Sequence, residues 1–138
     1  MRLTKPVPQP HPPVIVGGAF PYGARRALAY GDGWVPHARR PAYGDVLGLL
    51  PRFRTMAAEA GRRPDAVPVT VFGVAEDLDL IKRYEDAGVA RLVFNLPAGR
   101  ADEVLPILDR CAALMRAAQR ASGPPTRMTA GATPATLT

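Results

Sequence analysis

The sequence predicts an α/β fold built from four β-α units with parallel strands. Short β-branched runs alternate with longer segments whose apolar residues repeat at helical spacing. Glycines stand at several of the points where a strand run gives way to a helix or a helix ends. The connections are short, as expected for right-handed crossovers between neighbouring parallel strands. From the residues alone, this rhythm fits either a (β/α) barrel or a small doubly wound sheet.

The first unit is the stretch PVIVGGAFPYGARRALAYGDGWVPHA. Residues 13–17 form an unbroken apolar run, which is typical of a parallel strand buried on both faces. The run stops at Gly17-Gly18, and residues 21–30 follow as a predicted helix with proline in its first turn. Residues 34–35 form the second strand, directly after a glycine-rich turn. The stretch is therefore predicted to be strand, glycine corner, helix, strand.

Three more predicted helices and two more strands follow. The predicted helices span residues 43–60, 75–87 and 101–120, and the strands span residues 67–72 and 91–95. Pro51 predicts a kink or a break in the second helix. The last helix is expected to bury one apolar face. The residues of that face are Val104, Leu108, Cys111, Met115 and Ala118.

The composition divides the chain into three parts. Residues 1–13 are predicted to be an extended, proline-rich lead-in, residues 14–120 the α/β domain, and residues 121–138 a disordered tail. No apolar run is long enough to cross a bilayer, and no secretory leader is recognisable. The single cysteine, Cys111, is expected to be a small buried hydrophobe. Together these features predict a cytoplasmic protein without a membrane partner.

The net charge of +6 is compatible with an anionic partner. The basic residues are dispersed in pairs, with no long run and no interleaved aromatic residues, so nucleic acid is not expected. The sequence has no Cys/His cluster with metal-ligand spacing, so no metal is expected. It also has no GxGxxG, P-loop or GxSxG motif. The charge leaves a small polyanionic molecule open as a partner, and most of the arginines are expected to be solvated on helix faces.

The glycine corner is the first candidate binding site. It comprises Gly17, Gly18, Ala19, Phe20 and Tyr22. Small residues at the carboxyl end of a strand, leading into a helix, place unpaired N–H groups and the positive end of the helix dipole at one point. The corner is therefore predicted to bind an anion such as a phosphate. The alternative is a plain turn that packs the helix on the strand.

The second strand ends with Trp34 and His37 on the same side of the predicted sheet, at the rim of the substrate or cofactor site. Trp34 is expected either to flank a cofactor or to anchor the core, and the core is favoured. For His37, a polar rim position and a functional contact stay equally open. Arg39 and Arg40 are expected either to be solvated or to contact an anionic ligand, and solvation is favoured. Asn95 is expected either to form a turn or to bind a ligand, and the turn is favoured. The sequence indicates no catalytic residue.

The stretch PHPPVIVGGAFPYGARRALAYGDGWVPHA resembles the C-terminal portion of luciferase-like monooxygenases, which are flavin- or deazaflavin-dependent oxidoreductases. The similarity continues through a helix ending in EAGR, a PVTVFG strand and a DAGV turn, and it covers residues 5–115. It implies a partial TIM (β/α) barrel, with FMN or coenzyme F-420 as cofactor. It also implies hydride transfer to or from a small-molecule substrate, with or without oxygen insertion, and assigns the glycine corner to the cofactor phosphate. Ala19 stands where many relatives carry a hydroxyl residue, so backbone N–H groups or Tyr22 would make the contact.

A TIM barrel needs eight strands and about 250 residues, whereas this sequence supplies four strands. An open half-barrel exposes two sheet edges and an apolar inner face. We therefore expect either a fragment of a longer protein, inactive by itself, or a chain that is completed by self-association or by a second half-barrel. One alternative is a non-catalytic half-barrel fragment or assembly module that binds a partner chain. Another is a small α/β anion-binding domain of unrelated function.

Overall fold

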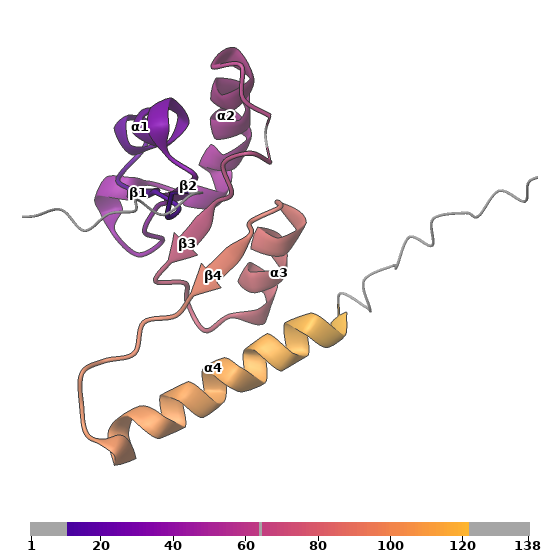
Figure 1. Cartoon of the computed structure of the whole chain (residues 1–138). Coiled ribbons are helices and arrows are strands. Elements are labelled where there is room, and N and C mark those ends of the chain that lie inside the picture. Colours follow the sequence, from indigo (N-terminus) through magenta and orange to yellow (C-terminus); the bar gives the residue numbers. More distant parts are fainter. Residues whose placement is uncertain (1–10, 64, 122–138) are drawn as a thin grey trace, which may run out of the picture.

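The computed structural model describes residues 11–63 and 65–121, and most of the predicted lead-in and tail lies outside these residues. The described residues form four short strands and four α-helices, as Figure 1 shows. In chain order the elements are β1 (Ile15–Gly17), α1 (Tyr22–Tyr30), β2 (Gly33–Val35), the 3-10 turn η1 (Pro41–Tyr43), α2 (Val46–Glu59), β3 (Thr70–Phe72), α3 (Leu78–Asp86), β4 (Arg91–Val93) and α4 (Ala101–Ala121). The predicted α/β class and the alternation of strands and helices are confirmed.

The four strands are parallel and follow one another in chain order. β1 pairs with β2, and β3 pairs with β4, each in parallel. The two pairs are joined by parallel bridges from Trp34 to Val69 and from His37 to Phe72. The Trp34 N–H donates to the Pro68 carbonyl at 3.1 Å across this junction. The spatial order is therefore β1-β2-β3-β4, without the reversal that a doubly wound sheet contains.

The core lies on one face of these strands. Val16, Trp34 and Val71 are buried on the face that the helices cover. Because side chains alternate along a strand, Ile15 and Phe72 lie on the opposite face, where they are 49% and 36% exposed. Among the described residues, helices thus cover one face of the strands and leave the other open.

Two helices begin later than the sequence predicts. Gly44 has φ +65°, so the backbone interrupts the helical path between η1 and α2. α2 then runs through Pro51 as one element, so the predicted break at this proline is wrong. α3 begins at Leu78 because the Asp77 carboxylate accepts the N–H groups of Asp79 and Leu80 at 2.9 and 3.1 Å.

The predicted inner face of α4 is only partly buried. Cys111 and Ala118 are buried, but Leu108 and Met115 are 44% and 51% exposed, so the prediction is wrong for these two. For Leu108 the reason is length, since α4 has 21 residues and α3, the helix beside it, has nine. Met115 lies between the buried Cys111 and Ala118 and is exposed because it borders an open groove beside α3 and β4. Figure 1 shows α4 extending well beyond α3. Much of α4 therefore has no neighbouring element within the described part of the chain.

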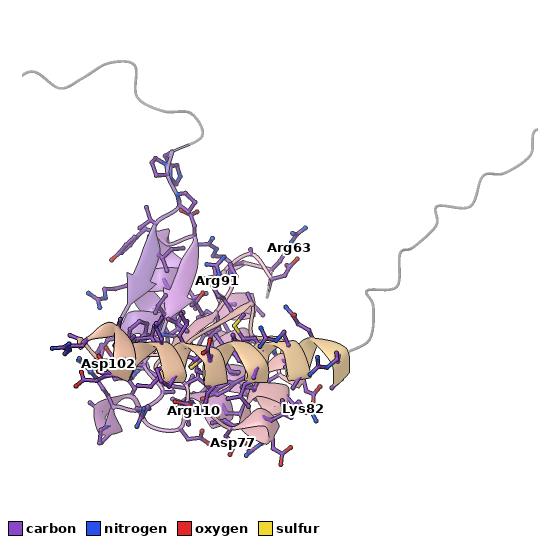
Figure 2. The ribbon with its side chains drawn as sticks, turned by 90° about the horizontal axis from the view of Figure 1, so that it is seen from below. Arg63, Asp77, Lys82, Arg91, Asp102 and Arg110 are labelled. Carbon is purple, nitrogen blue, oxygen red and sulfur yellow. The ribbon has the colours of Figure 1, made fainter. Side chains whose placement is uncertain are left out.

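One ion pair holds α4 to the segment before α3. Arg110 Nε donates to Glu76 Oε2 at 2.8 Å. This hydrogen bond lowers the pKa of the Glu76 carboxyl and raises that of the guanidinium. Figure 2 looks onto α4 from below, with Arg110 midway along the helix. No helix in the described ranges has the length and apolar character needed to cross a membrane.

Candidate functional site

The glycine corner is held by two side chains that bind its carbonyl groups. Trp34 Nε1 donates to the Gly18 carbonyl at 3.0 Å, and Arg26 Nη2 donates to the Gly17 carbonyl at 3.2 Å. Gly18 has φ +135°, a backbone conformation that disfavours any residue with a Cβ. The carbonyl groups of both glycines are thereby engaged within the protein, which fixes the direction of the corner's backbone.

A third glycine, which the sequence reasoning missed, brings α1 onto this corner. A Cβ at Gly23 would overlap the Gly18 carbonyl and lie 2.7 Å from the Gly18 Cα. The Gly23 N–H donates to the Ala19 carbonyl at 2.6 Å. Glycine is unfavourable inside a helix, so a glycine in a helical pattern suggests that another segment packs closely against it. The sequence contained this signal at position 23. The first turn of α1 can pack on the corner only because position 23 carries no side chain.

The corner presents N–H groups in a basic environment. In the described part of the chain, the N–H groups of Ala19 and Phe20 have no acceptor. The Arg26 guanidinium lies beside the corner, and the Arg52 guanidinium lies 5.3 Å from the centre of the Phe20 ring. The Arg26 side chain is exposed, but it bends back to the end of β1 rather than extending into solvent. Free N–H groups at a helix start among guanidinium groups favour an anion.

Trp34 lies behind the corner rather than on its open side. Its side chain is 0% exposed and stacks on Phe53 of α2, with 4.8 Å between ring centroids. The Phe20 ring lies tilted against the same indole, with 6.4 Å between ring centroids. Trp34 therefore acts on the corner through its hydrogen bond to Gly18, and it anchors that corner to the core.

His37 follows β2 and is held in one orientation. Its Nδ1 accepts the Arg39 N–H at 3.1 Å, so the neutral ring carries its proton on Nε2. The ring lies over Gly73: a Cβ there would be 2.7 Å from His37 Cε1. Phe72 packs edge-on against it, with 5.2 Å between centroids. Because no described residue bonds to Nε2, this nitrogen is a fixed donor at the carboxyl end of the strands.

Two other candidates meet around a small cavity. Arg39 and Asn95 line a space of about 190 Å³ at the carboxyl ends of β3 and β4, together with Glu76 and Cys111. Burial raises the pKa of the Cys111 thiol, and the Glu76 carboxylate raises it further. Cys111 is thus the buried hydrophobe that the sequence predicts, and the thiol is not activated. Arg40 is exposed and does not line this cavity.

Comparison with known proteins identifies the family. The family model for luciferase-like monooxygenases matches residues 2–76, more than half of the 138-residue chain. The chain belongs to the luciferase-like monooxygenase family. The matched stretch contains β1, the glycine corner, α1, β2 and β3, so the corner lies within the part that defines the membership. In the described residues, no group of His, Cys, Asp and Glu side chains is arranged to hold a metal ion.

Three curated relatives extend the similarity beyond the matched stretch. They are an uncharacterized protein of Mycobacterium bovis and uncharacterized proteins from two strains of Mycobacterium tuberculosis. Each is 34% identical over 115 residues, which cover 79% of this luciferase-like chain and 37% of the relative. The chain therefore spans little more than a third of the length of these relatives.

Proposed function

We propose that this chain supplies the cofactor-phosphate corner of a luciferase-like oxidoreductase. The enzyme transfers a hydride between a small-molecule substrate and FMN or coenzyme F-420, with or without insertion of oxygen. Family membership supports the reaction class. The single observation that carries the site is the pair of free N–H groups at Ala19 and Phe20, beside the Arg26 guanidinium. The proposed residues of the corner are Gly17, Gly18, Ala19, Phe20 and Tyr22.

The space at the corner fits an approaching phosphate. A Cβ built on Gly17 meets nothing closer than the Val35 carbonyl at 3.9 Å, so this side of the strand end is open. The Gly18 carbonyl is turned to Trp34, which keeps a repulsive acceptor away from an anion. The Ala19 and Phe20 N–H groups would hold the phosphate, and Tyr22, 74% exposed, would add its hydroxyl.

The proposed architecture is half of a TIM (β/α) barrel. Two features of the fold support it: the strands are parallel and lie in chain order, and the helices cover one face only. In a complete barrel the open face lines the interior, and the active site lies at the carboxyl ends of the strands. The glycine corner and His37 both lie at those ends. In this proposal His37 donates from Nε2 to a ligand oxygen at the rim.

The bound cofactor supplies the redox chemistry, and the protein positions it. This chain's own contribution is to bind the phosphate, to orient the cofactor from β1 and β2, and to present the His37 Nε2 as a hydrogen-bond donor. The proposal needs no acid/base pair among the described residues.

The test is a fluorescence titration of the purified chain with FMN, riboflavin and coenzyme F-420. Riboflavin lacks the phosphate, so the dissociation constant for FMN should be about ten- to a hundredfold lower than that for riboflavin. This ratio corresponds to the free energy of one or two charge-assisted hydrogen bonds. Gly17→Val fills the open side without a backbone clash and should remove this preference while the fold persists. Gly48→Ala, an exposed helical position away from the corner, is the control. An unchanged preference in Gly17→Val would place the phosphate elsewhere.

The second candidate function is a non-catalytic half-barrel that binds a partner chain. The observation that favours it is the open face carrying Ile15 and Phe72. It predicts association without affinity for any of the three titrants, so the same purified chain distinguishes the two functions.

A further inference from the structure

Both outer strands leave one edge unpaired. Among the described residues, β1 pairs only with β2, and β4 pairs only with β3. An unpaired strand edge presents N–H and C=O groups that another strand can bind. Because all four strands are parallel, the free edge of β4 and the free edge of β1 are complementary to each other.

The surfaces that adjoin these edges are apolar and uncovered. On the open face of the strands, Ile15 is 49% and Phe72 36% exposed. On α4, Leu105, Leu108 and Met115 are 53%, 44% and 51% exposed, and their spacing places them on one side of the helix. We call these three residues the α4 stripe. A groove of about 290 Å³ between α3, β4 and α4 reaches Met115, so the stripe and the β4 edge adjoin one surface.

We propose that a second copy of this chain covers these surfaces and closes an eight-stranded barrel. The inference rests on the half-barrel architecture proposed above. A twofold axis along the strands places β4 of each copy beside β1 of the other, so one symmetry operation pairs both free edges in parallel.

The first half of α4 and the helix α1 that would meet it carry opposite charges. In the closed barrel α4 of one copy lies beside α1 of the other, and both run in the same direction from the carboxyl ends of their strands. The first half of α4 carries three acids, Asp102, Glu103 and Asp109, and its one arginine, Arg110, is paired with Glu76; the arginines Arg116 and Arg120 lie in the second half. The helix α1 carries Arg25 and Arg26 and no acid. Tyr30 of α1 is 59% exposed and offers an aromatic surface to the α4 stripe. Charge and apolar surface thus favour the second copy as the occupant.

This assembly would complete the binding site. The glycine corner follows β1, whose free edge would border β4 of the other copy. The opposite wall of the barrel interior would then come from that copy. Each closed barrel would hold two equivalent corners, and an isolated copy would hold an open one.

The experiment measures mass by sedimentation velocity and light scattering on the 138-residue chain without cofactor. The expected result is a dimer. Leu108→Lys combined with Met115→Lys should raise the dimer dissociation constant by about tenfold or more, because the lysines would have to be buried without a partner. Ala113→Lys, at an exposed position on the other side of α4, is the matched control and should leave the dimer unchanged. Circular dichroism of each variant verifies that the helices persist.

Hydrogen exchange identifies the surface used. Amides of Ile15–Gly17 and Arg91–Val93 should exchange more slowly in the wild-type dimer than in the double lysine variant. A wild-type monomer at every concentration, an open-ended assembly larger than two, or a dimer with unprotected β1 and β4 amides would overturn the proposal. So would a chain that stays monomeric until the N-terminal half of a longer family member is added. A dimer that binds none of the cofactors would support the assembly and contradict the proposed function, so the two failures are distinguishable.

Discussion

Replacing Gly23 by alanine tests whether the close packing of α1 on the glycine corner governs this region. Gly23 lies in the first turn of a regular helix, and its φ is not positive. Helix propensity alone therefore predicts that alanine would stabilise the protein by about 0.8–1 kcal/mol. The structure predicts the opposite sign, because the new Cβ would overlap the Gly18 carbonyl and lie 2.7 Å from its Cα.

The magnitude follows from what would have to move. The obstacle is backbone, and Trp34 and Arg26 hold the neighbouring carbonyl groups, so the corner cannot yield by rotating a side chain. Overpacking of this kind costs about 1–3 kcal/mol, and this contact lies at the upper end. After the gain in helix propensity, Gly23→Ala should lower the free energy of unfolding by about 1–2 kcal/mol.

Gly48→Ala is the matched control in α2. It is also a helical glycine, but its Cβ would meet only the Asp45 carboxylate, at 2.7 Å, and that flexible side chain can turn away. Gly48→Ala should therefore raise the free energy of unfolding by about 0.5–1 kcal/mol. Urea unfolding, followed by the fluorescence of the single tryptophan, measures both variants. If Gly23→Ala stabilises the chain as Gly48→Ala does, the corner is looser than the structure shows, and the argument for a rigid anion site fails.

Three further predictions concern glycine strain, a buried thiol and an ion pair. Gly73→Ala should destabilise the chain more than Gly61→Ala: both glycines have positive φ, at a cost of about 1 kcal/mol, but only Gly73 touches the His37 ring. Equal urea midpoints, with an unchanged His37 ring signal in NMR, would contradict this. Cys111 should react with a disulfide reagent at pH 8 at least about tenfold more slowly in the native chain than in urea, because burial protects the thiol and raises its pKa; equal rates would refute the burial. The pKa of Glu76 is lowered in the folded chain, so its ion pair stabilises the fold above the unfolded pKa and stops doing so as pH falls through the folded pKa. Glu76→Gln should therefore lower the urea midpoint at pH 7 but not at low pH, and an equal loss at both would assign the effect to packing.

Much of the fold could be predicted because its signals are local. Strand runs, helix periods and the Gly17-Gly18 corner are each contained in a few neighbouring residues. The parallel direction of the strands followed from the alternation and the short connections, but their spatial order did not, because the same rhythm also fits a doubly wound sheet. Helix boundaries were less predictable. The start of α3 depends on the side chain of Asp77, and the gap before α2 depends on the backbone of Gly44.

The parts of the site that could not be predicted depend on contacts between distant segments. Arg62 belongs to the turn after α2, yet its guanidinium donates to the carbonyl groups of Leu28 and Gly31 at 3.1 and 2.9 Å, where it closes the end of α1. Sequence patterns treat such an arginine as a solvated surface residue. The exposure of Leu108 was equally hidden, because periodicity shows which side of a helix is apolar but not whether an element lies there to cover it.

The glycine corner depends both on local sequence and on contacts between distant segments. Its glycines follow from local sequence, but its rigidity comes from Trp34 of β2 and from Arg26 and Gly23 of α1, which approach it from different directions. Every group that holds the corner lies within the described chain, whereas the wall that would enclose a bound cofactor does not. A corner of this kind should keep its shape in the isolated chain and gain affinity only when β1 and β4 find partners. Cofactor affinity should therefore rise in parallel with the dimer fraction. The emission of Trp34, which reports the shape of the corner, should stay constant over the same range.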